Sequence, residues 1–147
     1  MNCTMALTDI KSPRIEARKP IDEGAVTADY CADRSRVVKR LNEALATKMV
    51  GVLRYRRHHF MARGIEAMRT ADELLVHANE EQEHADRIAE RIVQLGGAPD
   101  FSPDSLASRS HAQYVAGGTP VEMIREDLVA ERVAIDSYRE MIQYLGD

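Results

Sequence analysis

The chain has 147 residues, of which 44% are hydrophobic and 30% are charged, and this length suits one domain with a single core. It has no tryptophan and only two phenylalanines, which fits a helical protein better than a β-sandwich. The formal net charge of -4 gives no general attraction to nucleic acid or anionic membranes, and no apolar run reaches the ~18 residues of a membrane span.

The N-terminal segment differs in pattern from the rest of the chain. Residues 1–32 contain two prolines and one glycine without a sustained hydrophobic period, so we interpret them as an extension and residues 33–147 as one helical domain. Cys3 and Cys31 lie in this segment and are too few for a disulfide framework. A reducing cytoplasm is therefore the expected location.

Two long helices are predicted in the first part of the domain. Asp33 is a suitable N-cap for a helix over about residues 34–62, in which apolar residues recur in steps of three and four. After a very short link, a second helix is expected over about residues 67–95, ended by Gly96 and Gly97. The short link predicts that these two helices form an antiparallel hairpin.

A long crossover and a third helix complete the predicted fold, which is all-α. Residues 96–119 contain prolines and glycines and are long enough to return along the second helix, so the third helix would run parallel to the second. Thr119, Pro120 and Glu122 form a capping-box pattern that predicts a helix over about residues 120–145. Its expected inward stripe is Ile124, Leu128, Glu131, Ile135, Tyr138, Ile142 and Leu145.

Polar residues interrupt the apolar stripes of all three helices near the middle of their length. Lys48 lies at the midpoint of the first helix, Glu81 and His84 form a Glu-x-x-His in the second, and Glu131 lies near the middle of the third. A Glu and a His at i and i+3 share one helix face and can approach one metal ion. Because buried unpaired charge is costly, three such interruptions at one height predict a site or its relic.

In these features the chain resembles the ferritin-like superfamily, and among its members it is most similar to bacterioferritin-type proteins. The resemblance covers about residues 34–147 and is carried by Leu41-Asn42-Glu43-Ala44-Leu45, Tyr55, Glu81-Gln82-Glu83-His84-Ala85-Asp86-Arg87 and Asp127-Leu128-Val129-Ala130-Glu131. It implies a four-helix bundle with one long crossover. Such a bundle holds two irons with a Glu from each of two helices and a Glu-x-x-His from each of the other two.

Carried over position by position, the resemblance makes Glu81, His84 and Glu131 metal ligands and places Tyr55 beside the iron site, with a possible catalytic role. It implies iron oxidation and storage by a homo-oligomer that uses ferrous iron and dioxygen. The composition separately predicts a cytoplasmic protein with no membrane partner. Gln82 stands where haem-binding bacterioferritins place an axial methionine, so no haem is expected.

Two departures from the family pattern make the predicted di-iron site incomplete. Lys48 stands in place of the Glu ligand of the first helix, and the fourth helix, with the second Glu-x-x-His, is missing from this chain. Truncation would explain the missing helix, and another chain could instead supply it. Whether the chain is a ferroxidase is therefore left open by the sequence.

Charge counting leaves a second function open. Lys48 with a protonated His84 balances Glu81 and Glu131, so the ammonium can replace a metal ion as the counter-charge. The alternative function is thus a non-enzymatic helical assembly subunit with a metal-free charge cluster. A mononuclear zinc or iron site ranks last, because the ligand set lacks the two-His, one-carboxylate pattern.

Three further features receive structural interpretations. The first helix carries a basic run, Arg54, Arg56, Arg57, His58, His59 and Arg63, which we expect to be a solvated face or a subunit contact. Nucleic acid is accordingly not expected as a partner. His77 is expected to be a structural residue near Glu81, and Asp127 a surface charge one turn before Glu131.

Overall fold

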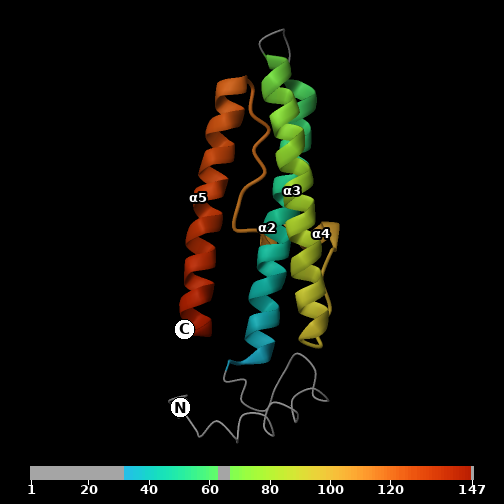
Figure 1. Cartoon of the computed structure of the whole chain (residues 1–147), viewed down its shortest axis with the longest axis vertical. Helices are drawn as coiled ribbons and strands as arrows, with labels where there is room; N and C mark the ends of the chain where they lie inside the picture. Colours follow the sequence, from blue (N-terminus) through green and yellow to red (C-terminus); the bar gives the residue numbers. More distant parts are fainter. Residues whose placement is uncertain (1–31, 63–66, 147) are drawn as a thin grey trace, which may run out of the picture.

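The computed structural model of the chain describes residues 32–62 and 67–146, which form an all-helical bundle (Figure 1). The helices are α2 (Arg34–Met61), α3 (Ala67–Gln94), the short α4 (Pro103–Arg109) and α5 (Pro120–Leu145). The three long helices begin and end within one residue of their predicted ranges, whereas α4 lies in the predicted crossover. Residues 1–31, including both cysteines, lie outside the described residues, so the division into an extension and a domain stays a prediction.

Local hydrogen bonds explain where the helices begin and end. The Asp33 side chain accepts hydrogen bonds from two backbone N–H groups in the first turn of α2. At the start of α5, Thr119 and Glu122 form the reciprocal capping box that the sequence predicts. After α3, Gly96 adopts a φ of 72°, a left-handed conformation that suits glycine and turns the chain away from the helix axis.

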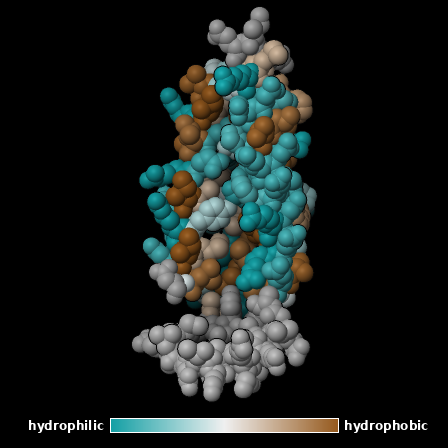
Figure 2. Space-filling view, in the orientation of Figure 1, coloured by the Kyte–Doolittle hydropathy of each residue, from teal (hydrophilic) through white to brown (hydrophobic). Residues whose placement is uncertain are grey.

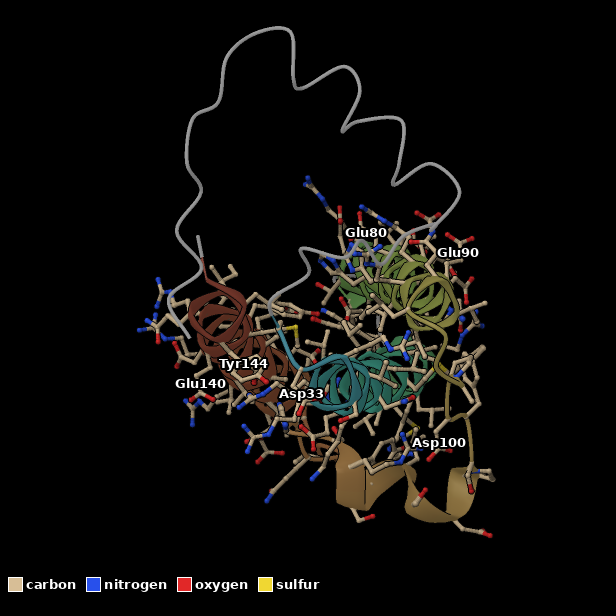
Figure 3. The ribbon with its side chains drawn as sticks, turned by 90° about the horizontal axis from the view of Figure 1, so that it is seen from below. Asp33, Glu80, Glu90, Asp100, Glu140 and Tyr144 are labelled. Atoms are coloured by element: carbon tan, nitrogen blue, oxygen red, sulfur yellow. The ribbon has the colours of Figure 1, made fainter. Side chains whose placement is uncertain are left out.

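Helix α2 is the central element, because α3, α4 and α5 all pack against it. The view along the bundle shows α3 and α5 on different sides of α2 (Figure 3). Helices α2 and α3 run antiparallel, and the crossover then returns the chain so that α5 runs parallel to α3 (Figure 1). This arrangement confirms the predicted hairpin and crossover.

The face that α5 turns toward α2 differs from the prediction. The large apolar residues of the predicted stripe are exposed by 43% to 66%: Ile124, Leu128, Ile135, Ile142 and Leu145. The buried residues of α5 are instead Met123, Asp127, Ala130 and Ala134. Hydrophobic periodicity in a sequence identifies the most apolar face of a helix, but it does not determine which neighbouring helix packs against that face. Figure 2 shows apolar side chains exposed along the length of α5.

Polar contacts fasten the crossover to α2. The Asn42 side chain donates to the carbonyl oxygen of Ala98 and accepts from the N–H of Asp100, at 3.1 and 2.7 Å. Further along, the Thr47 hydroxyl accepts from the N–H of His111 at 2.9 Å. These bonds hold the crossover along the side of α2 before α5 begins.

Among the described helices, none has both the length and the apolar character needed to cross a bilayer.

Candidate functional site

A buried ion pair joins α2 to α3 at the middle of both helices. Lys48 Nζ lies 2.8 Å from Glu81 Oε1, and the two residues are only 5% and 8% exposed. Gly51 leaves the space that the carboxylate needs, because a Cβ at that position would lie 3.1 Å from Glu81 Oε2. The two charged residues that interrupt the apolar stripes of these helices, Lys48 and Glu81, therefore contact each other directly.

The Lys48 ammonium keeps its proton in this setting. Burial opposes its charge, but the hydrogen bond and the attraction from Glu81 outweigh burial and raise the pKa of Lys48 above its ordinary value. The ammonium also lies 5.5 Å from the centre of the Tyr138 ring of α5, within range of a cation–π contact. Lys48 is thus a fixed positive charge between α3 and α5.

A second polar pair joins α2 to α5 close to the first. The Tyr55 hydroxyl donates a hydrogen bond of 2.8 Å to Glu131 Oε1. Burial and this hydrogen bond raise the pKa of Tyr55 well above its ordinary value, so the hydroxyl stays protonated and acts as a donor. Tyr55 is buried, whereas Glu131 is exposed. The Glu131 carboxylate is therefore anchored at one oxygen and accessible from solvent.

His84 completes the group of predicted site residues from the outer side. Its Nδ1 lies 3.2 Å from Glu81 Oε1, the same oxygen that receives the Lys48 ammonium, and its side chain is 48% exposed. The structure therefore brings Glu81 and His84 into contact, while Glu131 approaches from α5. Within residues 32–62 and 67–146, no three His, Cys, Asp or Glu side chains form a group that could hold a metal ion.

A groove between α3 and α5 gives solvent access to this group. Its volume is about 530 Å³, and its walls include Tyr55, Glu81, His84 and Glu131 together with apolar residues of both helices. A cavity of about 10 Å³, roughly the space of one water molecule, lies deeper and is lined in part by Lys48, Glu81 and Glu131. The carboxylates of Glu81 and Glu131 line both the groove and the deeper cavity.

The chemistry of these side chains decides whether they suit iron. Two carboxylates and an imidazole are suitable donors for ferrous iron. A protonated ammonium cannot ligate a metal, and Lys48 already neutralises Glu81 at 2.8 Å. The described residues therefore do not fit a complete di-iron centre by themselves, and the assignment of Glu81, His84 and Glu131 as ligands stays a prediction.

The predictions for three residues near this group were wrong, because these residues are buried rather than solvated. Arg54, His58 and Asp127 are 2%, 0% and 6% exposed. Arg54 Nε lies 2.8 Å from Asp127 Oδ1, and His58 Nδ1 lies 3.0 Å from Asp127 Oδ2. The i, i+4 spacing of Arg54 and His58 on one helix face was the signal that sequence reasoning missed.

His77 lies on the outer side of the same groove. Its Nδ1 is 3.2 Å from Glu80 Oε2, and its ring centre is 5.5 Å from that of Tyr55. Figure 3 shows Glu80 and Glu90 on the side of α3 that points away from α2. His77 therefore packs beside Tyr55 and pairs with a surface carboxylate, outside the inner group of Lys48 and Glu81.

Comparisons with known proteins identify similar chains. The family model for Ferritin, described as a ferritin-like domain, matches residues 38–147. A nutrient stress-induced DNA-binding protein of a Nostoc species is 32% identical over 116 residues, which cover 76% of this chain and 63% of that protein. A bacterioferritin of Desulfovibrio desulfuricans is 24% identical over 110 residues, covering 75% of this chain and 58% of that protein. The chain thus spans less than two thirds of either relative.

A solved structure has a similar arrangement of helices. It is described as a dodecameric thioferritin, the bacterioferritin-related protein of Bacteroides fragilis. The match has a TM-score of 0.73 at 24% sequence identity and covers 88% of this chain and 74% of that one. At this identity the match shows a shared fold.

Proposed function

Because this chain belongs to the ferritin-like family and is of the bacterioferritin type, we propose that it is an iron-binding subunit that takes up ferrous iron as a substrate and stores it in a homo-oligomer. The family match and the helical fold confirm the predicted resemblance. Storage in an assembly is supported by the similarity of this chain to a bacterioferritin and to a dodecameric thioferritin.

The convergence of Glu81 and Glu131 on one region of α2 carries this proposal. The two residues lie on α3 and α5, 50 positions apart in the sequence, and each is held by a side chain from the middle of α2. Lys48 holds the first carboxylate and Tyr55 holds the second. A bundle without a ligand to bind gains little from a carboxylate buried as deeply as Glu81, because desolvating it is costly.

The proposed roles follow from these contacts. Glu81 and Glu131 would present oxygen donors to ferrous iron that enters by the groove, and His84 would present a nitrogen donor from the groove wall. Tyr55 would orient Glu131 through its hydroxyl, whose raised pKa keeps it a hydrogen-bond donor. Lys48 would oppose iron binding, because it repels a cation and occupies Glu81 Oε1.

The Lys48–Glu81 contact also supports the second candidate function, a non-enzymatic assembly subunit with a metal-free charge cluster. In that case the ammonium is the permanent counter-charge and the cluster serves only to join the helices. Both functions predict that the isolated chain oxidises iron slowly. They differ in whether iron is retained by the assembled protein.

Iron loading in air separates the two functions. Ferrous iron is added to the metal-free full chain, dioxygen uptake is followed, and the iron that elutes with the protein is measured after size-exclusion chromatography. The iron-storage proposal predicts an oligomer that retains iron, with less retained by a Glu81→Ala variant. Glu90→Ala, which removes a carboxylate from the outer side of α3, is the matched control (Figure 3). An oligomer that retains no iron would favour the assembly function.

Nucleic-acid binding needs a separate test, since two of the relatives are named as DNA-binding proteins. These names do not fit the prediction that nucleic acid is not a partner. We nevertheless propose that the basic run of α2 is not a DNA surface, because Arg54 and His58 are buried and engaged with Asp127. A gel mobility shift assay with duplex DNA at low salt tests this proposal on the natural chain and on a variant with Arg56 and Arg57 replaced by alanine. DNA binding by the natural chain that is lost in the variant would contradict the proposal.

A further inference from the structure

A buried polar network connects α2, the crossover and α5. Both oxygens of Asp127 are used, one by Arg54 Nε at 2.8 Å and the other by His58 Nδ1 at 3.0 Å. Arg54 Nη1 also donates to the carbonyl oxygen of Gln113 at 3.1 Å, and His58 Nε2 lies 3.1 Å from that of Val115. Two side chains of α2 thus hold both the crossover and α5.

The two contacts of the His58 ring determine its proton count. Nδ1 faces a carboxylate oxygen and Nε2 faces a carbonyl oxygen, and both of these oxygens are acceptors. A neutral imidazole has one N–H and one lone pair, so either neutral tautomer would place a lone pair against an oxygen at about 3 Å. The geometry is therefore that of a ring with a proton on each nitrogen.

The packing of α5 against α2 depends strongly on this network, although α5 is a long helix. Its buried residues are Met123, Asp127, Ala130 and Ala134, so small side chains supply much of its apolar contact with α2. Asp127 is the charged member of this set, and it lies opposite two buried basic side chains. Loss of one of its hydrogen bonds would leave a buried polar group without a partner, which is costly.

We propose that Arg54, His58 and Asp127 form a proton-dependent latch, which holds α5 and the crossover on α2 while His58 carries both protons and loosens when the ring loses one. The groups that face the ring are Asp127 from α5 and the Val115 carbonyl from the crossover, and Arg54 of α2 reaches it through the shared carboxylate. Loss of one ring proton leaves a lone pair facing one of these two oxygens, so the latch loosens as the pH rises.

The latch borders the charge cluster, because Arg54 lines the deeper cavity together with Glu81 and Glu131. Asp127 lies one helical turn before Glu131, and the Tyr55–Glu131 hydrogen bond therefore depends on the position that the latch gives to α5. Arg54, His58 and Asp127 would be positioning residues for this part of α5, whether or not the cluster binds iron. Failure of iron storage would leave the latch untouched.

Hydrogen exchange of the full chain at about pH 6 and about pH 8.5 tests the latch. After correction for intrinsic rates, exchange in α5 relative to α3 should rise on the order of tenfold at the higher pH, the effect expected from losing one charge-assisted hydrogen bond. The ratio should become independent of pH in His58→Gln and should keep its pH dependence in His77→Gln. A ratio that is constant with pH in the natural chain, or one that still changes in His58→Gln, would overturn the proposal.

The nitrogen signals of the His58 ring give a second readout that requires no variant. Nuclear magnetic resonance of the labelled full chain should show an N–H on both ring nitrogens at about pH 6, and loss of one of them should accompany the rise in α5 exchange. A ring with a single N–H at that pH, with α5 still protected from exchange, would contradict a latch that needs two protons.

Discussion

The two long-helix contacts of α2 are built from different chemistry. Against α3, α2 packs through apolar clusters in which Leu45, Ala85 and Ile92 are fully buried. Against α5, it uses small side chains and polar pairs, among them Arg54 with Asp127 and Tyr55 with Glu131. The hairpin therefore gains its stability from buried apolar area as well as from the Lys48–Glu81 ion pair, whereas the position of α5 depends mainly on a few directional contacts.

This difference predicts how each contact responds to change. Apolar packing loses free energy in proportion to the volume removed, and it has no titratable group. A buried charged pair fails more abruptly, because removing one partner leaves the other charge uncompensated. Substitutions at matched depth on the two sides of α2 should therefore give different patterns of unfolding as well as different magnitudes.

Asp127→Ala should have the largest effect. It leaves Arg54 and His58 buried without their shared carboxylate, and breaking a buried pair in this way costs about 3–5 kcal/mol of unfolding free energy. Chemical denaturation measures the total, and hydrogen exchange should show that α5 loses protection before α2 and α3 do. Equal loss of protection in all three helices would mean that α5 is not held separately.

Leu45→Ala tests the apolar side of the comparison. Leu45 is fully buried between α2 and α3, and its truncation should lower the free energy of unfolding by about 3 kcal/mol. The protection of α2 and α3 should fall together, and the loss should be the same at about pH 6 and about pH 8.5, because no titratable group is involved. A loss confined to α5 would contradict the division into two kinds of contact.

Lys48→Met should have an intermediate effect of about 2 kcal/mol, because it leaves the Glu81 carboxylate buried beside His84 alone. The folded pKa of Lys48 is raised, so its contribution is complete below the unfolded lysine value of about 10.4 and is lost only as the pH rises through the higher folded value. Denaturation between about pH 6 and 9 should therefore show a constant difference from the natural chain. A difference that changes within this range would indicate that Lys48 titrates there.

Tyr55→Phe should have the smallest effect of the four. It removes the hydroxyl that donates to Glu131 but keeps the ring in its apolar cluster, and the accessible carboxylate can bind water instead. The expected loss is about 1 kcal/mol in denaturation experiments. A loss as large as that of Asp127→Ala would show that this hydrogen bond, rather than the latch, fixes α5.

Much of the fold could be predicted because its signals are local. Asp33 and the Thr119–Glu122 pair mark helix starts through their own backbone contacts, and the short link after α2 leaves little alternative to a hairpin. Lys48 and Glu81 were found because charged residues interrupt apolar stripes at matching heights. Their direct contact is what such a pattern requires of buried charges.

The part that could not be predicted depends on how α5 is rotated about its axis. Its stripe from Ile124 to Leu145 is the most apolar face, yet α2 receives the adjacent face that carries Asp127 and Ala130. Arg54 and His58 read as surface residues in a basic run because their partner is about 70 residues away in the sequence. Pairing over such a distance leaves no periodic signal in a single sequence.

The central claim is that the Lys48 ammonium weakens iron binding at the cluster of Glu81 and Glu131, and ferrous iron binding under anaerobic equilibrium dialysis tests it most directly. The account predicts that Lys48→Glu binds iron at least on the order of tenfold more tightly than the natural chain, because a nearby positive charge is replaced by a donor. Lys39→Glu, the same charge change at an exposed position of α2, should bind iron as the natural chain does. Equal binding by all three proteins, or an equal gain in both variants, would contradict the claim.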